Sequence, residues 1–222
     1  MNRRTHCAVV RRVCAGLSLG CLTGLLAGPT VAADTASKTS NTVEITPFVG
    51  TMGGGKFEDP TDGSDRDLDS GTNWGVFVDF NAGSPERQYE MFYTQQGTTV
   101  QGAEPFDMDV QYLHIGGIVN FTDVSPVVPY FGMTVGATRF GPDARGLDDE
   151  TKLSFSAGGG LKYLFSDHFG LRFDARAYVT LLDTDSDIFC VSAPESGAGC
   201  RIRAASDTFF QYSATLGFVA AF

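Results

Sequence analysis

The sequence lacks the several runs of about 20 apolar residues that a polytopic helical membrane protein needs. It also lacks a basic excess, because 16 Lys and Arg stand against 26 Asp and Glu, whereas a nucleic-acid binder normally carries the opposite sign. Its 27 glycines follow no three-residue repeat, which excludes collagen. What it does contain is 18 Phe and 7 Tyr among 222 residues, too much apolar surface for a disordered chain. The length suits one domain or two small ones.

The N-terminus has the pattern of a secretory signal over residues 1–33. Four arginines without an acid precede a short apolar stretch at 13–27, which Gly and Ser interrupt. Val31-Ala32-Ala33 then offers small residues where a signal peptidase cuts, so we expect cleavage after Ala33. A buried N-terminal helix is the weaker alternative, because no polar face accompanies the apolar run. Cleavage would leave a polar lead at 34–41 and a net charge near -14 (12 basic and 26 acidic residues).

Cysteine is scarce once that signal is set aside. Three of the five cysteines lie at or before residue 21, which leaves Cys190 and Cys200 around a short loop. An even pair in an exported protein predicts a disulfide between them. A metal centre would need further Cys or His nearby in the sequence, and none is present, so we predict no metal site.

The remaining chain alternates apolar and non-apolar residues with period two and shows no convincing helical stripe. Phe210, Tyr212 and Leu216 fall on one face of the last segment, for example, and Gln211, Ser213 and Thr215 on the other. The first segment, about 42–51, is the least regular because Pro47 interrupts it. Eight strands are predicted, and the seven after the first are centred on 74–80, 88–94, 112–121, 130–138, 152–165, 171–181 and 210–222.

The residue composition of the two faces indicates whether each face meets lipid, water or the barrel interior. The apolar face is aromatic near the strand ends, as at Phe121, Phe165 and Trp74, which is typical of a lipid-facing band edged by aromatic girdles. A soluble, lipocalin-like barrel is the alternative. The other face combines glycines with charges, and unpaired charge inside a narrow barrel would be costly. We therefore predict a paired lumen network of Glu44, Asp79, Glu90, Lys162, Arg172, Asp174 and Arg176.

The gaps between the predicted strands provide an independent indication of topology. They alternate between long (52–73, 97–106, 140–150, 183–206) and short (81–87, 122–127, 166–170). Outer-membrane barrels have long extracellular loops and short periplasmic turns, and they must close to leave no edge in lipid. The prediction is therefore an all-β, eight-stranded antiparallel transmembrane β-barrel over residues 42–222.

The final residues, Leu216-Gly217-Phe218-Val219-Ala220-Ala221-Phe222, carry a resemblance to a known family. The chain resembles the small eight-stranded outer-membrane β-barrels, namely the OmpA-like transmembrane domain and its OmpX/Ail-like relatives. The resemblance implies a bacterial outer-membrane location, contact with lipids and lipopolysaccharide, and a tail with Phe218 and Phe222 that the barrel-assembly machinery reads. Ala220 departs from the family, which often has an aromatic residue there.

Fold alone does not choose among that family's functions. His114 points into the predicted lumen, and His168 lies in a predicted periplasmic turn, so neither suggests a catalytic base. The acidic spacings Asp65-x-Asp67-x-Asp69 and Asp183-x-Asp185-x-Asp187 lack the Gly and Glu of an EF-hand loop. A solvated acidic rim is the preferred interpretation, with loose divalent-cation binding as the alternative. We predict a monomeric, non-catalytic protein without a cofactor, in a structural or surface-interaction role; the alternatives are a narrow small-solute channel and a lipid A-modifying enzyme.

Overall fold

The computed structural model describes residues 43–58, 65–84, 86–101, 105–121, 126–143, 148–182, 187–193, 197–204 and 208–222. All of them belong to one compact unit, Thr39–Phe222. The predicted signal sequence, its cleavage site and the polar lead lie outside the described residues. Every regular element within the described ranges is a β-strand. Those ranges include no helix of the length and apolarity needed to cross a membrane.

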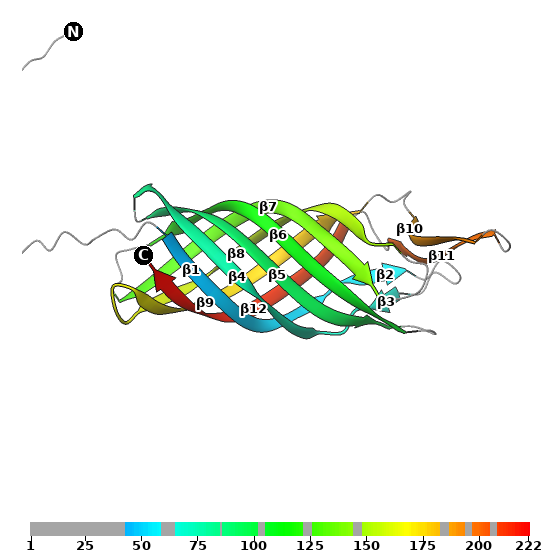
Figure 1. Cartoon of the computed structure of the whole chain (residues 1–222), viewed down its shortest axis with the longest axis horizontal. Coiled ribbons are helices and arrows are strands. Elements are labelled where there is room, and N and C mark those ends of the chain that lie inside the picture. Colours follow the sequence, from blue (N-terminus) through cyan, green and yellow to red (C-terminus); the bar gives the residue numbers. More distant parts are fainter. Residues whose placement is uncertain are drawn as a thin grey trace, which may run out of the picture. The chain divides into compact units, whose positions relative to one another are not determined.

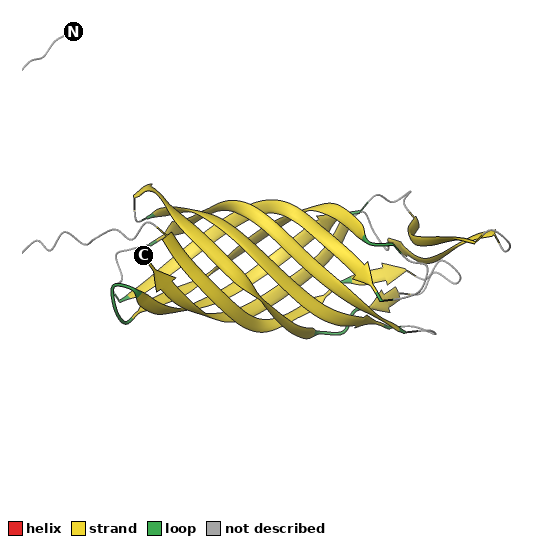
Figure 2. Ribbon diagram, in the orientation of Figure 1, coloured by secondary structure: helices red, strands yellow, loops and turns green. Residues whose placement is uncertain are grey.

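Eight strands form a closed antiparallel barrel (Figure 1). Each barrel strand pairs with the next barrel strand along the chain, including β1 with β4 and β9 with β12. The first strand, β1, also pairs with the last, β12, and this pairing closes the ring. Figure 2 shows the barrel strands tilted relative to the barrel axis, as closure of a sheet requires. The barrel strands are β1 Val43–Gly54, β4 Gly71–Ser84, β5 Arg87–Val100, β6 Phe106–Asn120, β7 Val127–Pro142, β8 Glu150–Leu164, β9 Phe169–Leu181 and β12 Thr208–Ala221.

A second sheet lies within two connections that the sequence had indicated as plain loops. It has the order β10-β11-β2-β3 and contains β2 Lys56–Glu58, β3 Asp65–Asp67, β10 Asp187–Ala193 and β11 Gly197–Ala204. Its shorter strands have three residues, too few for a period-two pattern, and β2 pairs with a segment far along the chain. Local patterning could not predict them. We call this end of the barrel the loop end, and the opposite end, where β1 begins and β12 ends, the turn end.

The barrel strands also extend further towards the loop end than the sequence indicated. β5 continues to Val100 and β6 already begins at Phe106, so only 101–105 connect them. That connection is no longer than 121–126 at the turn end. The reason is that the period-two alternation continues beyond the predicted strands, through Gly97–Val100 on β5 and Phe106–Val110 on β6.

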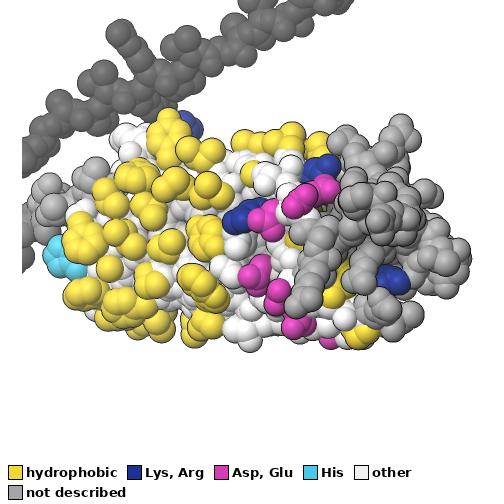
Figure 3. Space-filling model, turned by 45° about the vertical axis from the view of Figure 1, so that its right-hand side comes forward, with side chains coloured by type: hydrophobic (Ala, Val, Ile, Leu, Met, Phe, Trp, Pro, Cys, Tyr) yellow, Lys and Arg dark blue, Asp and Glu magenta, His cyan; other side chains and the backbone are white. Residues whose placement is uncertain are grey.

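Side chains divide between the two faces of the wall as the alternation predicted. The outer face is apolar along most of its length, with Ile115 and Met133 more than 60% exposed, and charged side chains gather beyond this band (Figure 3). Glycines on the inner face leave room for long side chains. A Cβ at Gly158 would lie 2.9 Å from the Arg176 side chain, and one at Gly160 would lie 2.7 Å from the Tyr130 hydroxyl. The lumen can therefore hold bulky residues without widening.

Candidate functional site: the filled lumen

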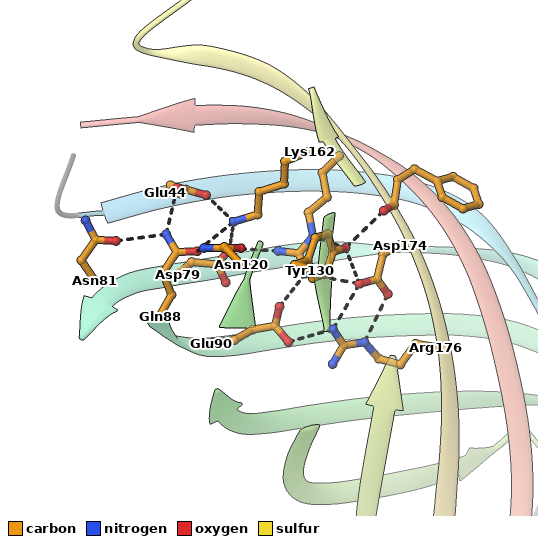
Figure 4. A network of polar contacts seen from close by, with 12 residues as sticks. Glu44, Asp79, Asn81, Gln88, Glu90, Asn120, Tyr130, Lys162, Asp174 and Arg176 are labelled. Carbon is orange, nitrogen blue, oxygen red and sulfur yellow. Dashed lines mark hydrogen bonds and ion pairs between the residues drawn. The ribbon is translucent and has the colours of Figure 1, made fainter. Parts of the chain in front are cut away.

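The structure brings all seven predicted lumen charges together near the turn end. Figure 4 labels all of them except Arg172. Strand register places Glu44 opposite Asp79, and Asp79 opposite Glu90, so three carboxylates stand side by side on β1, β4 and β5. On β8 and β9, Lys162 lies opposite Arg172. Three of the four acids thus project from a different part of the wall than the three bases, whereas Asp174 lies between Arg172 and Arg176 on β9.

Each base contacts at least two acids. Lys162 Nζ lies 2.6 Å from Glu44 Oε2 and 3.1 Å from Asp79 Oδ2. Arg172 lies 2.9 Å from Asp79, 2.5 Å from Glu90 and 3.3 Å from Asp174. Arg176 lies 2.8 Å from Glu90 and 3.2 Å from Asp174. Only Glu44 has appreciable solvent contact, at 15% exposure of its side chain. Because the rest are buried, each charge depends on its partners for the solvation that water would otherwise give.

Uncharged residues complete this network, and the sequence analysis did not assign them to it. The Tyr130 hydroxyl accepts a hydrogen bond from Arg172 Nε at 2.8 Å and donates one to Asp174 Oδ2 at 2.6 Å. Gln88 donates to Glu44 at 2.8 Å, and its Oε1 accepts from Lys162 at 3.0 Å and from Asn120 at 2.9 Å. Their positions in the sequence could have identified them, because each occupies an inward-facing position of the period-two alternation.

A layer of rings and hydroxyls lies next to the ionic layer. The Arg172 guanidinium stacks over Phe77, 3.9 Å from its ring centroid, and Phe77 contacts Phe92. His114 stacks on Phe92 with 5.0 Å between centroids. Buried Tyr112 and Tyr178 pack together at 4.5 Å. Aromatic rings therefore occupy the central part of the lumen.

Among the inward residues that the structure describes, only His114 has contacts that resemble those of a catalytic base. Its Nε2 lies 2.8 Å from Ser154 Oγ, and its Nδ1 lies 2.9 Å from Thr134 Oγ1. Ser154 comes from β8, so its proximity was not evident from the sequence. A nucleophile-base pair needs substrate access and an orienting partner. Here Ser154 is fully buried, and the second ring nitrogen bonds a hydroxyl rather than a carboxylate. His114 thus has the contacts of a hydrogen-bonded lumen histidine, as the sequence indicated.

The loop end of the lumen is mainly apolar, and a hydrogen bond of 3.1 Å between the buried side chains of Gln211 and Gln96 lies beside the apolar residues. Phe57, on the short strand β2, is completely buried and stacks on Phe209 with 5.1 Å between ring centroids. It also meets Phe140 edge-on at 6.0 Å. These rings belong to a buried cluster that continues through Met52, Leu68, Val100, Met108 and Val110. We call the wall residues Met52, Val100, Met108, Val110, Phe140 and Phe209 the apolar cup.

The remaining predicted residues lie at the two ends of the molecule. Phe218 packs on Phe169 at 5.7 Å, and Phe222 exchanges backbone hydrogen bonds with Val43 at the barrel seam. His168 accompanies them, with Nδ1 2.9 Å from the Ala221 carbonyl oxygen. The register of β10 and β11 places Cys190 opposite Cys200, and their disulfide stays a prediction.

The acidic loop motifs show no cation cage where they are described. In the first motif, Asp67 pairs with Lys56 at 3.4 Å and Asp69 accepts a hydrogen bond from Gln101 at 2.6 Å. Asp183 and Asp185, in the second motif, lie outside the described residues. No group of three His, Cys, Asp or Glu residues in the described part of the chain could hold a metal ion.

A closed antiparallel barrel with an apolar exterior and a polar, filled lumen is the architecture of a small outer-membrane protein. Residues 22–218 match the model of the outer membrane protein beta-barrel domain, and the chain belongs to that family. It is thus a bacterial outer-membrane barrel. The apolar band faces lipid, and the loop end is extracellular in the arrangement that such barrels share.

Solved structures show the same fold at low sequence identity. Neisserial surface protein A is 14% identical, and the match covers 81% of this chain and 97% of that one with a TM-score of 0.55. The outer membrane protein OprG from Pseudomonas aeruginosa is also 14% identical, with 82% and 96% covered and a TM-score of 0.57. A search of curated proteins gave no significant match.

Proposed function

We propose that the protein is a non-catalytic outer-membrane barrel with a structural or surface-interaction role, in adhesion or envelope stability, and that its lumen does not conduct. The observation that carries this proposal is the filling of the lumen in three successive layers. Arg172, Phe92 and Phe57 represent the ionic, aromatic and apolar layers, and each is at most 1% exposed. An eight-stranded barrel has an interior that side chains can fill, and these side chains fill it.

Among the described residues, the outer wall of the barrel and the second sheet, β10-β11-β2-β3, are the surfaces that can interact with other molecules. We propose that the outer wall contacts outer-membrane lipids and lipopolysaccharide, that the β12 tail with Phe218 and Phe222 is read by the barrel-assembly machinery after secretory export, and that the protein is a monomer. The polar outward residues above the lipid band, such as Asp107, Asp109 and Arg139, support contact with charged headgroups.

Two measurements test the role. Purified protein in planar bilayers should show no conductance steps, and reproducible ion conduction would establish the channel alternative instead. A deletion strain should be impaired in serum, detergent or host-cell-binding challenges and should regain wild-type behaviour on complementation. A strain that behaves as wild type in all three would overturn the structural and surface-interaction role.

A separate measurement addresses catalysis. The lipid A of the deletion strain should have the same mass spectrum as that of the wild type, because the buried Ser154 and His114 have no access to the lipid surface. An altered acylation pattern that the wild-type gene restores would show that the protein is a lipid-modifying enzyme.

A further inference from the structure

Pro47 lies in the interior of β1, within the lipid band. It faces outward between the exposed side chains of Ile45 and Val49. The other prolines in the described barrel strands, Pro129 and Pro142, lie near the two ends of β7. Proline has no backbone N–H, and within sheets it is found essentially on edge strands. A closed barrel has no edge, so the interior position of Pro47 is unusual.

The N–H that Pro47 lacks would face β12 rather than β4. At the turn end, Val43 and Phe222 exchange backbone hydrogen bonds of 3.3 Å and 2.9 Å. Hydrogen-bonded pairs recur at every second residue of an antiparallel ladder, and the register between β1 and β12 is constant along its length. Pro47 therefore stands opposite Phe218 at a hydrogen-bonding position, and the Phe218 carbonyl oxygen receives no donor from β1.

Side chains do not replace this bond across the seam between β1 and β12. Glu44 is the described residue of β1 whose side chain makes polar contacts, and its partners Gln88 and Lys162 lie on β5 and β8. The hydroxyl of Thr46, beside Pro47, is buried without a partner. Water in the bilayer core cannot satisfy a free carbonyl group, so the missing bond is a cost to the closed barrel.

The missing bond does not open the wall. A Cβ at Gly217 would lie 3.0 Å from the Pro47 carbonyl oxygen and 2.6 Å from the Thr46 methyl group, so the two strands run close together here. Pairing is also present on both sides of Pro47, with Ile45 opposite Ala220 at one of them. The closed barrel gains nothing from the proline, which points to a role before closure.

We propose that Pro47 guards the free edge of β1 in the chain whose barrel has not yet closed. Until β1 meets β12, the side of β1 that faces away from β4 is an unpaired strand edge. Such an edge is a template for pairing with another chain, and a proline on it blocks that pairing. The partner that Pro47 excludes is a second copy of this chain, because two identical strands form a symmetric, self-complementary antiparallel pair. The guard does not depend on the proposed surface role.

Refolding at several protein concentrations tests the proposal. The urea-unfolded mature chain is diluted into liposomes, and the heat-modifiable band measures the folded fraction. The folded fraction of the wild type should change little with concentration. Pro47→Val restores an N–H on the free edge, so its folded fraction should fall severalfold as the concentration rises, because association of two chains competes with closure of one. Pro47→Ala restores the same N–H and is the second variant if Pro47→Val does not fold even at the lowest concentration.

Cross-linking identifies the strand that pairs. Val49→Cys, in a Cys190→Ser/Cys200→Ser background, places a thiol on the outer face of β1 two residues from Pro47. A short bismaleimide added on dilution from urea should give severalfold more dimer in the presence of Pro47→Val than in its absence. Met91→Cys, on the outer face of β5, reports association away from the seam and should show no such rise.

Matched variants separate the N–H from the side chain. Thr51→Val also puts a β-branched apolar side chain on the outer face of β1 but adds no donor, so it should fold as the wild type does. Pro47→Val/Val49→Pro moves the missing N–H to the next position that faces β12 and should restore folding at high concentration. In the assembled barrel, Pro47→Val should raise the urea midpoint, because its N–H reaches the Phe218 carbonyl oxygen.

Four results would overturn the proposal. Equal folded fractions of Pro47→Val and wild type at every concentration would show that the edge needs no guard. A loss of folding as large in Thr51→Val, or a rise in dimer as large through Met91→Cys, would indicate general aggregation. An assembled Pro47→Val barrel no more stable than the wild type would show that the Phe218 carbonyl oxygen already has a donor. These measurements use neither conductance nor the phenotype of a deletion strain, so their failure is distinguishable from a failure of the proposed function.

Discussion

The membrane-spanning part of the barrel and its extracellular end are built with opposite polarity. Between the membrane surfaces, Phe173 faces out while Arg172 and Asp174 face in. At the extracellular end, Asp107 and Asp109 face out while Met108 faces in. The strands run continuously through both regions, so the period-two alternation persists. The polarity of the two faces is exchanged, because the outer face changes from apolar to polar and the inner face from polar to apolar. The surroundings explain the exchange, because lipid solvates apolar groups in one region and water solvates polar groups in the other.

The two regions consequently fill the same tube in different ways. Where the wall faces lipid, the lumen holds ion pairs and hydrogen-bonded side chains. Where the wall faces water, the lumen holds a compact apolar cluster like the core of a soluble barrel. The stability of the first region therefore depends on matched partners, and that of the second on buried apolar area.

The largest effect should come from unpairing the ionic layer. Arg172→Ala leaves Asp79 and Glu90 without a principal partner and should lower the free energy of unfolding by about 3–5 kcal/mol. Urea titration of the heat-modifiable band measures it. Lys56→Ala, which removes the base of an exposed ion pair above the membrane, should cost about 0–1 kcal/mol. Equal costs would mean that the lumen pairs are as well solvated as surface ones.

The next effect separates the two outer surfaces. Phe173→Arg puts a charge into the lipid band and should cost up to about 2–4 kcal/mol near the midplane. Thr99→Arg, on the outward side of β5 above the band, should be nearly neutral because its side chain reaches water. The same urea titration compares the two. If Thr99→Arg is as costly as Phe173→Arg, the lipid band extends further than the polar residues indicate.

Sequence patterning was sufficient for the barrel and for its charged lining, since Arg172, Asp174 and Arg176 occupy alternate positions of one strong strand. It was insufficient for features that depend on contacts between residues far apart in the sequence. Ser154 and Thr134 reach His114 from two other strands, and Phe57 is buried only because the chain turns over the mouth of the barrel at Gly54 and Gly55. A strand of three residues is too short to show a period-two pattern. The sequence therefore could not predict β2, which pairs with the distant segment β11.

A smaller effect concerns the uncharged support of the ionic layer. Tyr130→Phe keeps the ring beside Arg172 but removes the hydroxyl that joins Arg172 to Asp174. Hydrogen bonds to charged groups contribute about 1.5–3 kcal/mol, so a loss in that range is expected. Tyr163→Phe, on the exposed outer face, is the matched control and should be close to neutral. Equal losses would indicate that Tyr130 serves only to fill space.

The smallest effect on the barrel should come from Cys190→Ser with Cys200→Ser. The two residues lie opposite each other in the β10–β11 hairpin, outside the barrel wall. A disulfide closing so short a loop stabilises by about 2–3 kcal/mol at most in the chain-entropy model, and the benefit is confined to the hairpin. Heat-modifiability should therefore be unchanged, while protease added to whole cells should cleave residues 183–206 faster. Equal cleavage of both forms would mean that the bridge is absent or without effect, and free-thiol labelling of both cysteines in the unmodified protein would refute the disulfide itself.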